Sequence, residues 1–311
     1  MIKILYAAKP EEFEAYQGYI NAGLSELGIE NTIVEKSDNP AGIDYIIYAP
    51  SSSLQDFTAF TNTKLVQNLW AGVETTVGNK TLTQPFARMV EFGLKQGMIE
   101  YVTGHVLRHH LDTDFFAKQK PGVWRDDHVP PLTRDRVVGV LGLGALGQAC
   151  AESLATLGFQ VMGWSRSPKT IENITCLNGE SGLKTLLGQA EIIVLLLPNT
   201  PATHHIIDAE SISMMKEGAA IINPGRGSLI NDDALLDALD SGHISAATLD
   251  VFATEPLPAD HPYWAHSNVL VTPHVASATR IETATQTVIE NIRRGEAGEE
   301  FLHLVDRDLG Y

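Results

Sequence analysis

The sequence predicts an α/β protein with two domains, each built on a parallel β-sheet with helices on its faces. Three observations predict this class. The chain has 311 residues, 44% of them hydrophobic, which is enough for two cores of ordinary size. Short aliphatic runs alternate with helical patterns, as parallel sheets require. A glycine-rich turn, GLGALG (142–147), also separates one such run from a helical pattern.

The first part of the chain shows the alternation clearly. Aliphatic or β-branched runs predict strands at residues 2–6, 31–35, 43–48 and 65–69, with a helix at 11–27. Segment 91–119 has apolar residues at mixed spacings of three and four, so we expect one long helix that closes this domain.

The second part begins with a strand, turn, helix and strand in residues 136–166, the size of one βαβ unit. Later strands are predicted at 191–197, 219–223, 246–249 and 269–272. A helix at 278–294 follows the last strand and can return to the first domain. The predicted domains are therefore 1–98 with 278–311, which hold the substrate, and 99–277, which hold a dinucleotide, with a cleft between them.

Composition excludes several function classes. The formal net charge of −16 opposes binding to nucleic acid or to an anionic membrane surface. The two cysteines, Cys150 and Cys176, lack metal-ligand spacing, and we expect them to be reduced. The N-terminal stretch lacks the features of a signal peptide, and the longest apolar run is too short to span a bilayer. A cytoplasmic protein without a metal site is the expectation.

The glycine-rich turn predicts a dinucleotide site. Gly142 allows a tight turn, Gly144 lets the backbone approach a pyrophosphate, and Gly147 lets the helix pack against the strand. The pyrophosphate then lies at the start of the helix, beside Ala145 and Leu146, where free N–H groups favour an anion. The alternative is a strand-to-helix turn that needs glycine only for its shape.

The end of the next strand indicates which dinucleotide binds. An acidic residue that binds the adenosine ribose is expected about 20 residues beyond the turn. The sequence has GWSRSPK (163–169) instead, with Ser165, Arg166, Ser167 and Lys169. Hydroxyls and cations suit the 2′-phosphate of NADPH, so NADPH is favoured over NAD. The alternative is an ordinary polar turn with solvated charges.

Three strong polar residues follow later strands. They are Arg226 in INPGRGSLI, Glu255 in TLDVFATEPLP and His274 in VLVTPHVASAT. Ligands of open α/β sheets bind beyond the carboxyl ends of the strands, so these three side chains can converge. Arg226 can hold a carboxylate, His274 can exchange a proton, and Glu255 can orient the imidazole. Each taken alone can also be a structural loop residue.

These motifs together resemble the D-isomer-specific 2-hydroxyacid dehydrogenase family, over most of residues 136–280. The resemblance implies that Arg226 binds substrate, that His274 is the acid-base residue and that Glu255 tunes it. Asp250 then holds the nicotinamide carboxamide, with His274 beside the same ring. Further cofactor contacts implied by the resemblance are Leu197, Pro198, Thr203, Pro224 and Gly225. The alternative for Asp250, taken alone, is a helix or turn cap.

The stretch NLWAGVETTVGN (68–79) resembles the substrate loop of this family, whose backbone N–H groups bind the substrate carboxylate. Ala71, Gly72 and Val73 occupy the matching positions. Trp70 stands where the family usually has a small residue, so it either narrows the pocket or is a core or interface residue, and Glu74 replaces the usual Asp.

Segment MIEYVTGHVLRHH and the distal Trp124 are most similar to the glyoxylate/hydroxypyruvate reductase branch. The resemblance also implies a homodimer formed through the nucleotide domain, with 91–119 and the loop near Trp124 at the interface. The expected activity is NADPH-dependent reduction of a small 2-oxo acid to the D-2-hydroxy acid. The alternatives are an NAD-preferring dehydrogenase for another substrate class and a non-catalytic, cofactor-sensing binding protein.

Overall fold

The computed structural model divides the chain into two compact units. Residues 1–118, 121–307 and 310 are described. One unit comprises Met1–Leu94 with Ala278–Tyr311, and the other comprises Lys95–Ser277. The first boundary falls within a helix, four residues before the predicted one at 98, and the second lies between 277 and 278.

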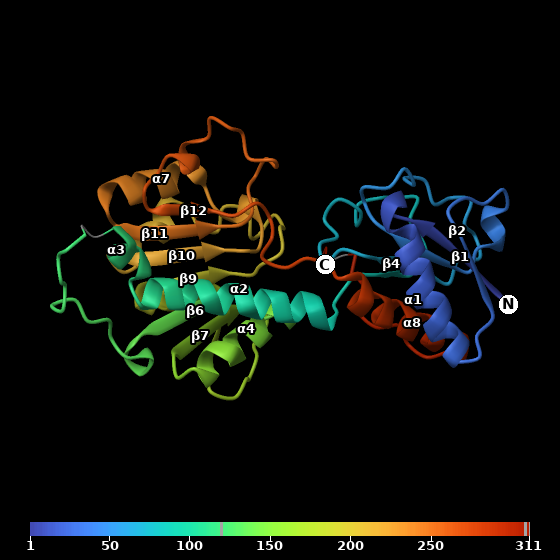
Figure 1. Cartoon of the computed structure of the whole chain (residues 1–311), viewed down its shortest axis with the longest axis horizontal. Coiled ribbons are helices and arrows are strands. Elements are labelled where there is room, and N and C mark those ends of the chain that lie inside the picture. The colour runs from blue at the N-terminus through green and yellow to red at the C-terminus, as the bar shows by residue number, and fades with distance from the viewer. Residues whose placement is uncertain (119–120, 308–309, 311) are drawn as a thin grey trace. The chain divides into compact units, whose positions relative to one another are not determined.

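The first unit contains a parallel five-stranded sheet in the order β2-β1-β3-β4-β5 (Figure 1). This is the flavodoxin-like order of a doubly wound sheet. The strands are β1 (Ile2–Ala7), β2 (Asn31–Val34), β3 (Tyr45–Tyr48), β4 (Leu65–Asn68) and β5 (Phe86–Ala87). Strand β5 has only two residues, which is too short for a pattern in the sequence to reveal it.

Alternate residues of β3 face opposite sides of this sheet, since a strand has a period of two. Tyr45 and Ile47 pack toward α1 (Phe13–Glu26) and α8 (Ile281–Ala297), which lie against each other. Ile46 and Tyr48 face the loops between β3 and β5, which fill the other side. The predicted return of the last helix to this unit is therefore observed.

The second unit contains a parallel seven-stranded sheet in the order β12-β11-β10-β9-β6-β7-β8. Numbered within the unit, this is the order 3-2-1-4-5-6 of dinucleotide-binding sheets with one strand added. The strands are β6 (Val137–Leu141), β7 (Gln160–Ser165), β8 (Ile174–Asn178), β9 (Ile192–Leu195), β10 (Ala219–Asn223), β11 (Ile244–Leu249) and β12 (Val269–Val271). The prediction of two doubly wound parallel sheets is confirmed.

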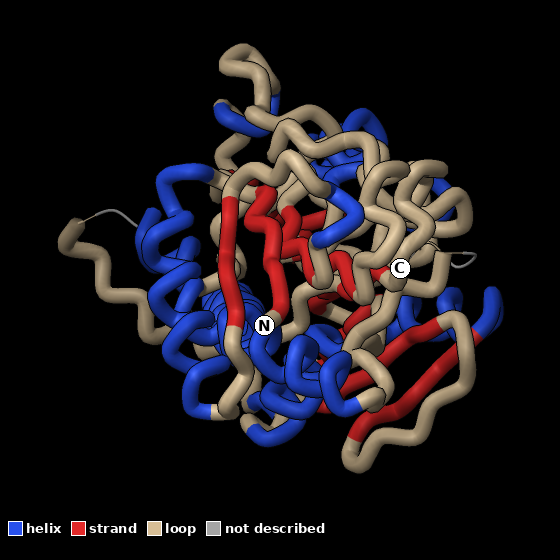
Figure 2. Tube along the Cα trace, turned by 90° about the vertical axis from the view of Figure 1, so that its right-hand side faces the viewer, coloured by secondary structure: helices blue, strands red, loops and turns tan. Residues whose placement is uncertain are grey.

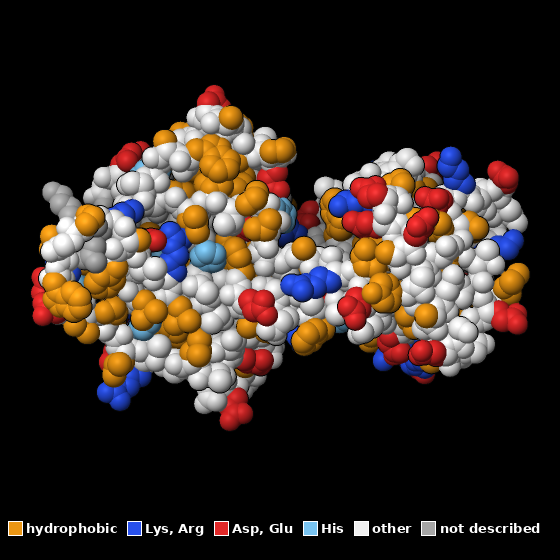
Figure 3. All heavy atoms as spheres, in the orientation of Figure 1, with side chains coloured by type: hydrophobic (Ala, Val, Ile, Leu, Met, Phe, Trp, Pro, Cys, Tyr) orange, Lys and Arg blue, Asp and Glu red, His pale blue; other side chains and the backbone are white. Residues whose placement is uncertain are grey.

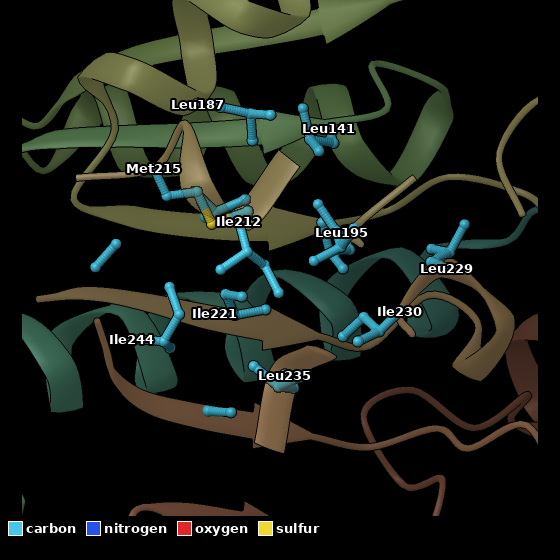
Figure 4. Packing of buried hydrophobic residues seen from close by; sticks show 14 of the residues in the cluster. Leu141, Leu187, Leu195, Ile212, Met215, Ile221, Leu229, Ile230, Leu235 and Ile244 are labelled. Carbon is cyan, nitrogen blue, oxygen red and sulfur yellow. The ribbon is translucent and has the colours of Figure 1, made fainter. Parts of the chain in front are cut away.

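Helices cover both faces of this sheet. Figure 1 labels its strands, and Figure 2 colours the helices, strands and loops along the chain. On one face, Ile192 and Val194 of β9 pack against α2 (Phe92–His110) and α4 (Ala145–Thr156). On the other, Ile193 and Leu195 join a cluster with α5 (Gly179–Gln189), α6 (Ala209–Ser213) and α7 (Asp232–Ser241), shown in Figure 4. Burial of these aliphatic faces fixes the carboxyl ends of the strands in register.

The expected single helix at 91–119 is wrong. The chain forms α2 and then a separate short helix, α3 (Thr113–Lys118), because Asp112 takes a left-handed conformation with φ of 48°. A residue at positive φ cannot continue a right-handed helix. The last predicted position, Gln119, lies outside the described residues.

Candidate active site

The turn that carries Arg226 follows β10 and is held by the strand's last residue. The buried side chain of Asn223 accepts a hydrogen bond from Gly225 N at 3.1 Å and donates one to Arg226 O at 2.9 Å. A Cβ at Gly227 would lie 1.9 Å from the backbone carbon of Phe252, so only glycine lets this turn pack against the loop after β11. The Arg226 guanidinium donates to Gly225 O at 2.7 Å.

Glu255 and His274 come from the loops after β11 and β12 and form a pair. His274 Nδ1 lies 2.7 Å from Glu255 Oε2, and Phe252 N donates to Glu255 Oε1 at 2.9 Å. A carboxylate can only accept, so Nδ1 carries the proton and donates it. This tautomer leaves Nε2 to exchange a proton with a ligand, and the side chain is 54% exposed.

His274 is held in a left-handed conformation, with φ of 54°, by the fully buried Asp250. The backbone N–H of His274 donates to Asp250 O at 2.8 Å. The carboxylate of Asp250 accepts from Thr272 Oγ1 at 2.6 Å, from Val275 N at 2.9 Å and from Ala276 N at 2.9 Å. Left-handed backbone at a non-glycine residue costs about 1–3 kcal/mol and persists only when the surroundings impose it.

A second layer supports Asp250. The hydroxyl of Tyr101, on α2, lies 2.8 Å from Thr272 Oγ1, whose own hydrogen goes to Asp250. Tyr101 is therefore the donor, and the chain of bonds runs from α2 to the turn that carries His274. In this conformation Asp250 exposes no surface and its carboxylate binds the loop after β12, whereas the family resemblance implies a contact with the nicotinamide carboxamide.

The glycine-rich turn has the geometry of a phosphate cradle. Gly142 has φ of 106°, and a Cβ at Gly147 would lie 1.7 Å from Gly142 O, so the fold itself requires glycine at both positions. Gly144 differs, because a Cβ there would meet no atom within 4 Å. The helix that begins at Ala145 has no side-chain cap. Open space beside uncapped N–H groups suits the pyrophosphate of a dinucleotide.

The GWSRSPK stretch folds beside this turn. β7 ends at Ser165, whose hydroxyl donates to Ser167 O at 2.8 Å. The Lys169 amine donates to Leu143 O, within the glycine-rich turn. Arg166, Ser167 and Lys169 are exposed, whereas Ser165 is buried. The structure thus brings the predicted 2′-phosphate residues to the predicted pyrophosphate turn.

The loop after β9 closes on itself. Thr203 Oγ1 donates to Pro198 O at 2.6 Å and accepts from Thr200 N at 2.9 Å. Leu197 is buried, and so are Pro224 and Gly225 after β10. These five predicted cofactor residues follow the ends of β9 and β10, and β9 is the strand next to β6.

The predicted substrate residues lie in the other unit, in the loop after β4. Trp70 is 42% exposed, which argues against a core role; Ala71 and Gly72 are half-buried and Val73 is buried. Sequence reasoning missed the polar residues that hold the loops: Asn223, Thr272 and Tyr101 in one unit, and Asn68 in the other. An Asn or Asp directly at a predicted strand end is the signal that could have found two of them.

The loops beyond β10, β11 and β12 thus combine a guanidinium donor with an imidazole that a carboxylate orients. This arrangement can bind a carboxylate or carbonyl oxygen and exchange a proton with it. No three His, Cys, Asp or Glu side chains among the described residues cluster closely enough to hold a metal ion. Within the described ranges, none of the helices combines the length and apolar character that a bilayer-spanning helix needs.

The chain is similar to known proteins. The family model for the NAD-binding domain of D-isomer-specific 2-hydroxyacid dehydrogenases matches residues 105–276. A glyoxylate/hydroxypyruvate reductase A from Yersinia enterocolitica is 39% identical over 229 residues, which are 73% of this chain and 72% of that protein.

Solved structures agree with this match. A D-isomer-specific 2-hydroxyacid dehydrogenase from Xanthobacter autotrophicus Py2, in complex with NADPH and MES, is 39% identical, with a TM-score of 0.91 over 99% of both chains. An NADPH-dependent glyoxylate/hydroxypyruvate reductase from Sinorhizobium meliloti, in complex with NADP and sulfate, is 32% identical, with a TM-score of 0.86 over 100% of both chains. The protein therefore belongs to the D-isomer-specific 2-hydroxyacid dehydrogenase family, and it is similar to the glyoxylate/hydroxypyruvate reductase A branch.

Proposed function

We propose that this protein reduces a small 2-oxo acid, of the glyoxylate or hydroxypyruvate type, to the D-2-hydroxy acid with NADPH. The observation that carries the proposal is the 2.7 Å contact between His274 and Glu255 beyond the sheet, beside the turn of Arg226. The names of the relatives from Yersinia and Sinorhizobium support the substrate class.

In the proposed mechanism, Arg226 binds the substrate through its forked guanidinium and stabilises the negative charge that develops on the carbonyl oxygen. His274 donates the proton that this oxygen takes up, from Nε2. Glu255 accepts from Nδ1 and so fixes the orientation of the ring. Bound NADPH supplies the hydride for the carbonyl carbon.

The loop 70–73 is proposed to hold the substrate carboxylate through the N–H groups of Ala71, Gly72 and Val73. Trp70, which is exposed, then limits the size of the substrate side chain. Glycine-rich loops offer successive N–H groups in this way to anions.

NADPH selectivity is proposed to come from the turn after β7. Arg166 and Lys169 carry positive charge, and the segment has hydroxyls and no carboxylate. A charge-assisted hydrogen bond contributes about 1.5–3 kcal/mol, so Arg166→Ala should raise the KM for NADPH about tenfold or more. The KM for NADH should stay unchanged, because NADH has no 2′-phosphate.

The test is steady-state oxidation of NADPH and of NADH against glyoxylate, hydroxypyruvate, pyruvate and phenylpyruvate. Preference for NADPH, with turnover of glyoxylate or hydroxypyruvate above that of phenylpyruvate, supports the proposal. Equal use of NADH would refute the cofactor assignment and favour an NAD-preferring dehydrogenase. No turnover with either cofactor would favour a cofactor-sensing binding protein.

We also propose a homodimer through the nucleotide-binding unit. Large apolar side chains are exposed on and after α3, including Phe115, Trp124 and Val129, and Trp124 is 89% exposed. Figure 3 shows hydrophobic side chains gathered over this part of the unit. Such a patch typically marks an interface. Light scattering should give the mass of a dimer for the wild type and of a monomer for Trp124→Ser.

The cytoplasm is the compartment we propose, because both cysteines are free and a reducing compartment keeps them so. Burial raises the pKa of the Cys150 thiol to about 12, so this cysteine is unreactive.

A further inference from the structure

Asn68 is the last residue of β4 and directly precedes the proposed substrate loop. Its side chain is fully buried. Nδ2 donates to two carbonyl oxygens of that loop, Trp70 O and Gly72 O, each at 3.0 Å. One carboxamide therefore draws two alternate carbonyls of the loop toward the strand end.

Other donors bind the remaining carbonyls. Leu69 O accepts from Thr279 Oγ1 at 2.9 Å, and Trp70 O accepts a second bond from Met89 N at 3.0 Å. Val73 O accepts from the N–H groups of the following turn, at 2.9 and 2.8 Å. The carbonyls of residues 69, 70, 72 and 73 are thus all bound within this unit.

The N–H groups of the same loop behave differently. Those of Ala71, Gly72 and Val73 donate to no acceptor in the described part of the chain. A peptide unit whose carbonyl is fixed inward presents the N–H on its opposite side outward. The N–H groups of Ala71 and Val73, which share peptide units with Trp70 O and Gly72 O, therefore face outward, where they can bind an anion.

We propose that Asn68 is a positioning residue for substrate binding, which holds the loop so that its N–H groups face the substrate carboxylate. This inference rests on the proposed function and assigns part of its substrate affinity to a residue that does not touch the substrate. Asn68 acts before the substrate arrives, because a loop already in the bound conformation loses less entropy on binding.

Only a carboxamide satisfies the geometry. Both acceptors are carbonyls, so the group that faces them must be the NH₂, and the orientation of the amide is fixed. The oxygen of the Asn68 carboxamide, Oδ1, is buried without a hydrogen-bond partner among the described residues. An unpaired buried acceptor destabilises the fold. A serine offers one donor in place of two, and an alanine offers none.

Gln84 provides a matched control in the same unit. Its buried Nε2 also donates to two backbone carbonyls, Phe57 O at 3.2 Å and Phe60 O at 2.8 Å, and its Oε1 is also unpaired. The loop that it holds is not part of the proposed site. Gln84→Ala and Asn68→Ala therefore remove the same kind of contact, and only the second touches the substrate loop.

The experiment compares steady-state kinetics and Tm of the wild type, Asn68→Ala, Asn68→Ser and Gln84→Ala. Asn68→Ala should raise the KM for glyoxylate about 30-fold, the equivalent of about 2 kcal/mol for two lost hydrogen bonds. The kcat and the Kd for NADPH should change less than about threefold, because the residue acts on substrate binding alone. The KM of Asn68→Ser for glyoxylate should lie between those of the wild type and Asn68→Ala. Gln84→Ala should lower Tm and leave the KM for glyoxylate unchanged.

Two results would overturn the inference. One is an equal change of KM in Asn68→Ala and Gln84→Ala, which would mean a general loss of structure. The other is a fall in kcat for Asn68→Ala with the KM for glyoxylate unchanged.

Oxalate binding, measured by thermal shift without turnover, separates this inference from the proposed function. If the wild type reduced no 2-oxo acid, the proposed function would fail. Oxalate binding that Asn68→Ala abolishes and Gln84→Ala retains would still support the role of Asn68. Equal oxalate binding by all variants would refute it.

Discussion

Asp250→Asn tests whether this residue holds the catalytic turn or the cofactor. The substitution keeps the shape of the side chain and replaces one carboxylate oxygen by NH₂. Three donors, Thr272 Oγ1, Val275 N and Ala276 N, converge on the two oxygens, so the new NH₂ must face at least one of them.

The magnitude follows from this count. One buried N–H loses its acceptor, which costs about 1–3 kcal/mol, and the remaining bonds weaken from charge-assisted to neutral strength, by about 1 kcal/mol each. With two bonds remaining, the sum is about 3–5 kcal/mol, with a central value of about 4 kcal/mol. For a unit of this size such a loss lowers Tm by about 8–16 °C.

The kinetic effect should follow the structural one. His274 keeps its left-handed conformation only while Asp250 binds both sides of the turn, so a weaker hold moves its imidazole away from Glu255. We expect kcat to fall about tenfold or more, because small misplacements of a proton donor are costly. The Kd for NADPH should change less than about twofold.

Differential scanning calorimetry and NADPH fluorescence titration measure these quantities. Thr272→Val serves as a graded control, since it removes one of the three donors without a change of charge, and it should give about a third of the Tm loss. A stable Asp250→Asn protein whose Kd for NADPH rises tenfold would refute the anchor role. It would instead support the contact with the nicotinamide carboxamide that the family resemblance implies.

Two further predictions concern other parts of the second unit. Gly144→Ala should keep its Tm and bind NADPH about tenfold more weakly, because the added methyl group enters open space beside the helix start. Gly147→Ala should not fold, because its Cβ would lie 1.7 Å from Gly142 O. Thermal melts with and without NADPH distinguish these outcomes. Burial, aided by Arg108, lowers the pKa of His109 from 6.5 to about 4. Between pH 6.5 and pH 4 the unfolded chain therefore binds more protons than the folded protein. The folded protein is thus destabilised as the pH falls from 6.5 to 4. The free energy of unfolding falls by about 3 kcal/mol over this range. His109→Gln should remove this fall from the pH dependence. An identical pH profile for wild type and variant would contradict the prediction.

Much of the fold was predictable because hydrophobic periodicity records burial. The strands of the second sheet are buried on both faces, so they appear as continuous aliphatic runs such as 192–195. The helix that ends at His110 was extended too far, because no Gly or Pro marks its end. Asp112 ends it through its backbone conformation, which an apolar pattern does not encode.

The proposed catalytic residues were predictable for a different reason. Each is a strong polar residue just after a strand, and the carboxyl ends of parallel strands meet at one edge of the sheet. The conformation of the loops was not predictable, because it depends on contacts distant in sequence, such as Tyr101 with Thr272. A tyrosine in a helical pattern gives no sign that its hydroxyl supports a turn 171 residues away.

Three buried Asx residues at or just beyond strand ends explain how this fold fixes its functional loops. Asn68 ends β4, Asn223 ends β10 and Asp250 comes directly after β11, and each binds the backbone of a loop beside it. The strand ladder fixes the Cα of each residue, and a side chain with only two torsions loses little entropy when it binds. The chemistry of each follows from what it must hold. Asn68 binds carbonyls and must donate, Asp250 binds donors and must accept, and Asn223 binds one of each. An exchange between Asn and Asp at any of these positions therefore sets an acceptor against an acceptor or a donor against a donor and removes a hydrogen bond, although it leaves the size of the side chain unchanged.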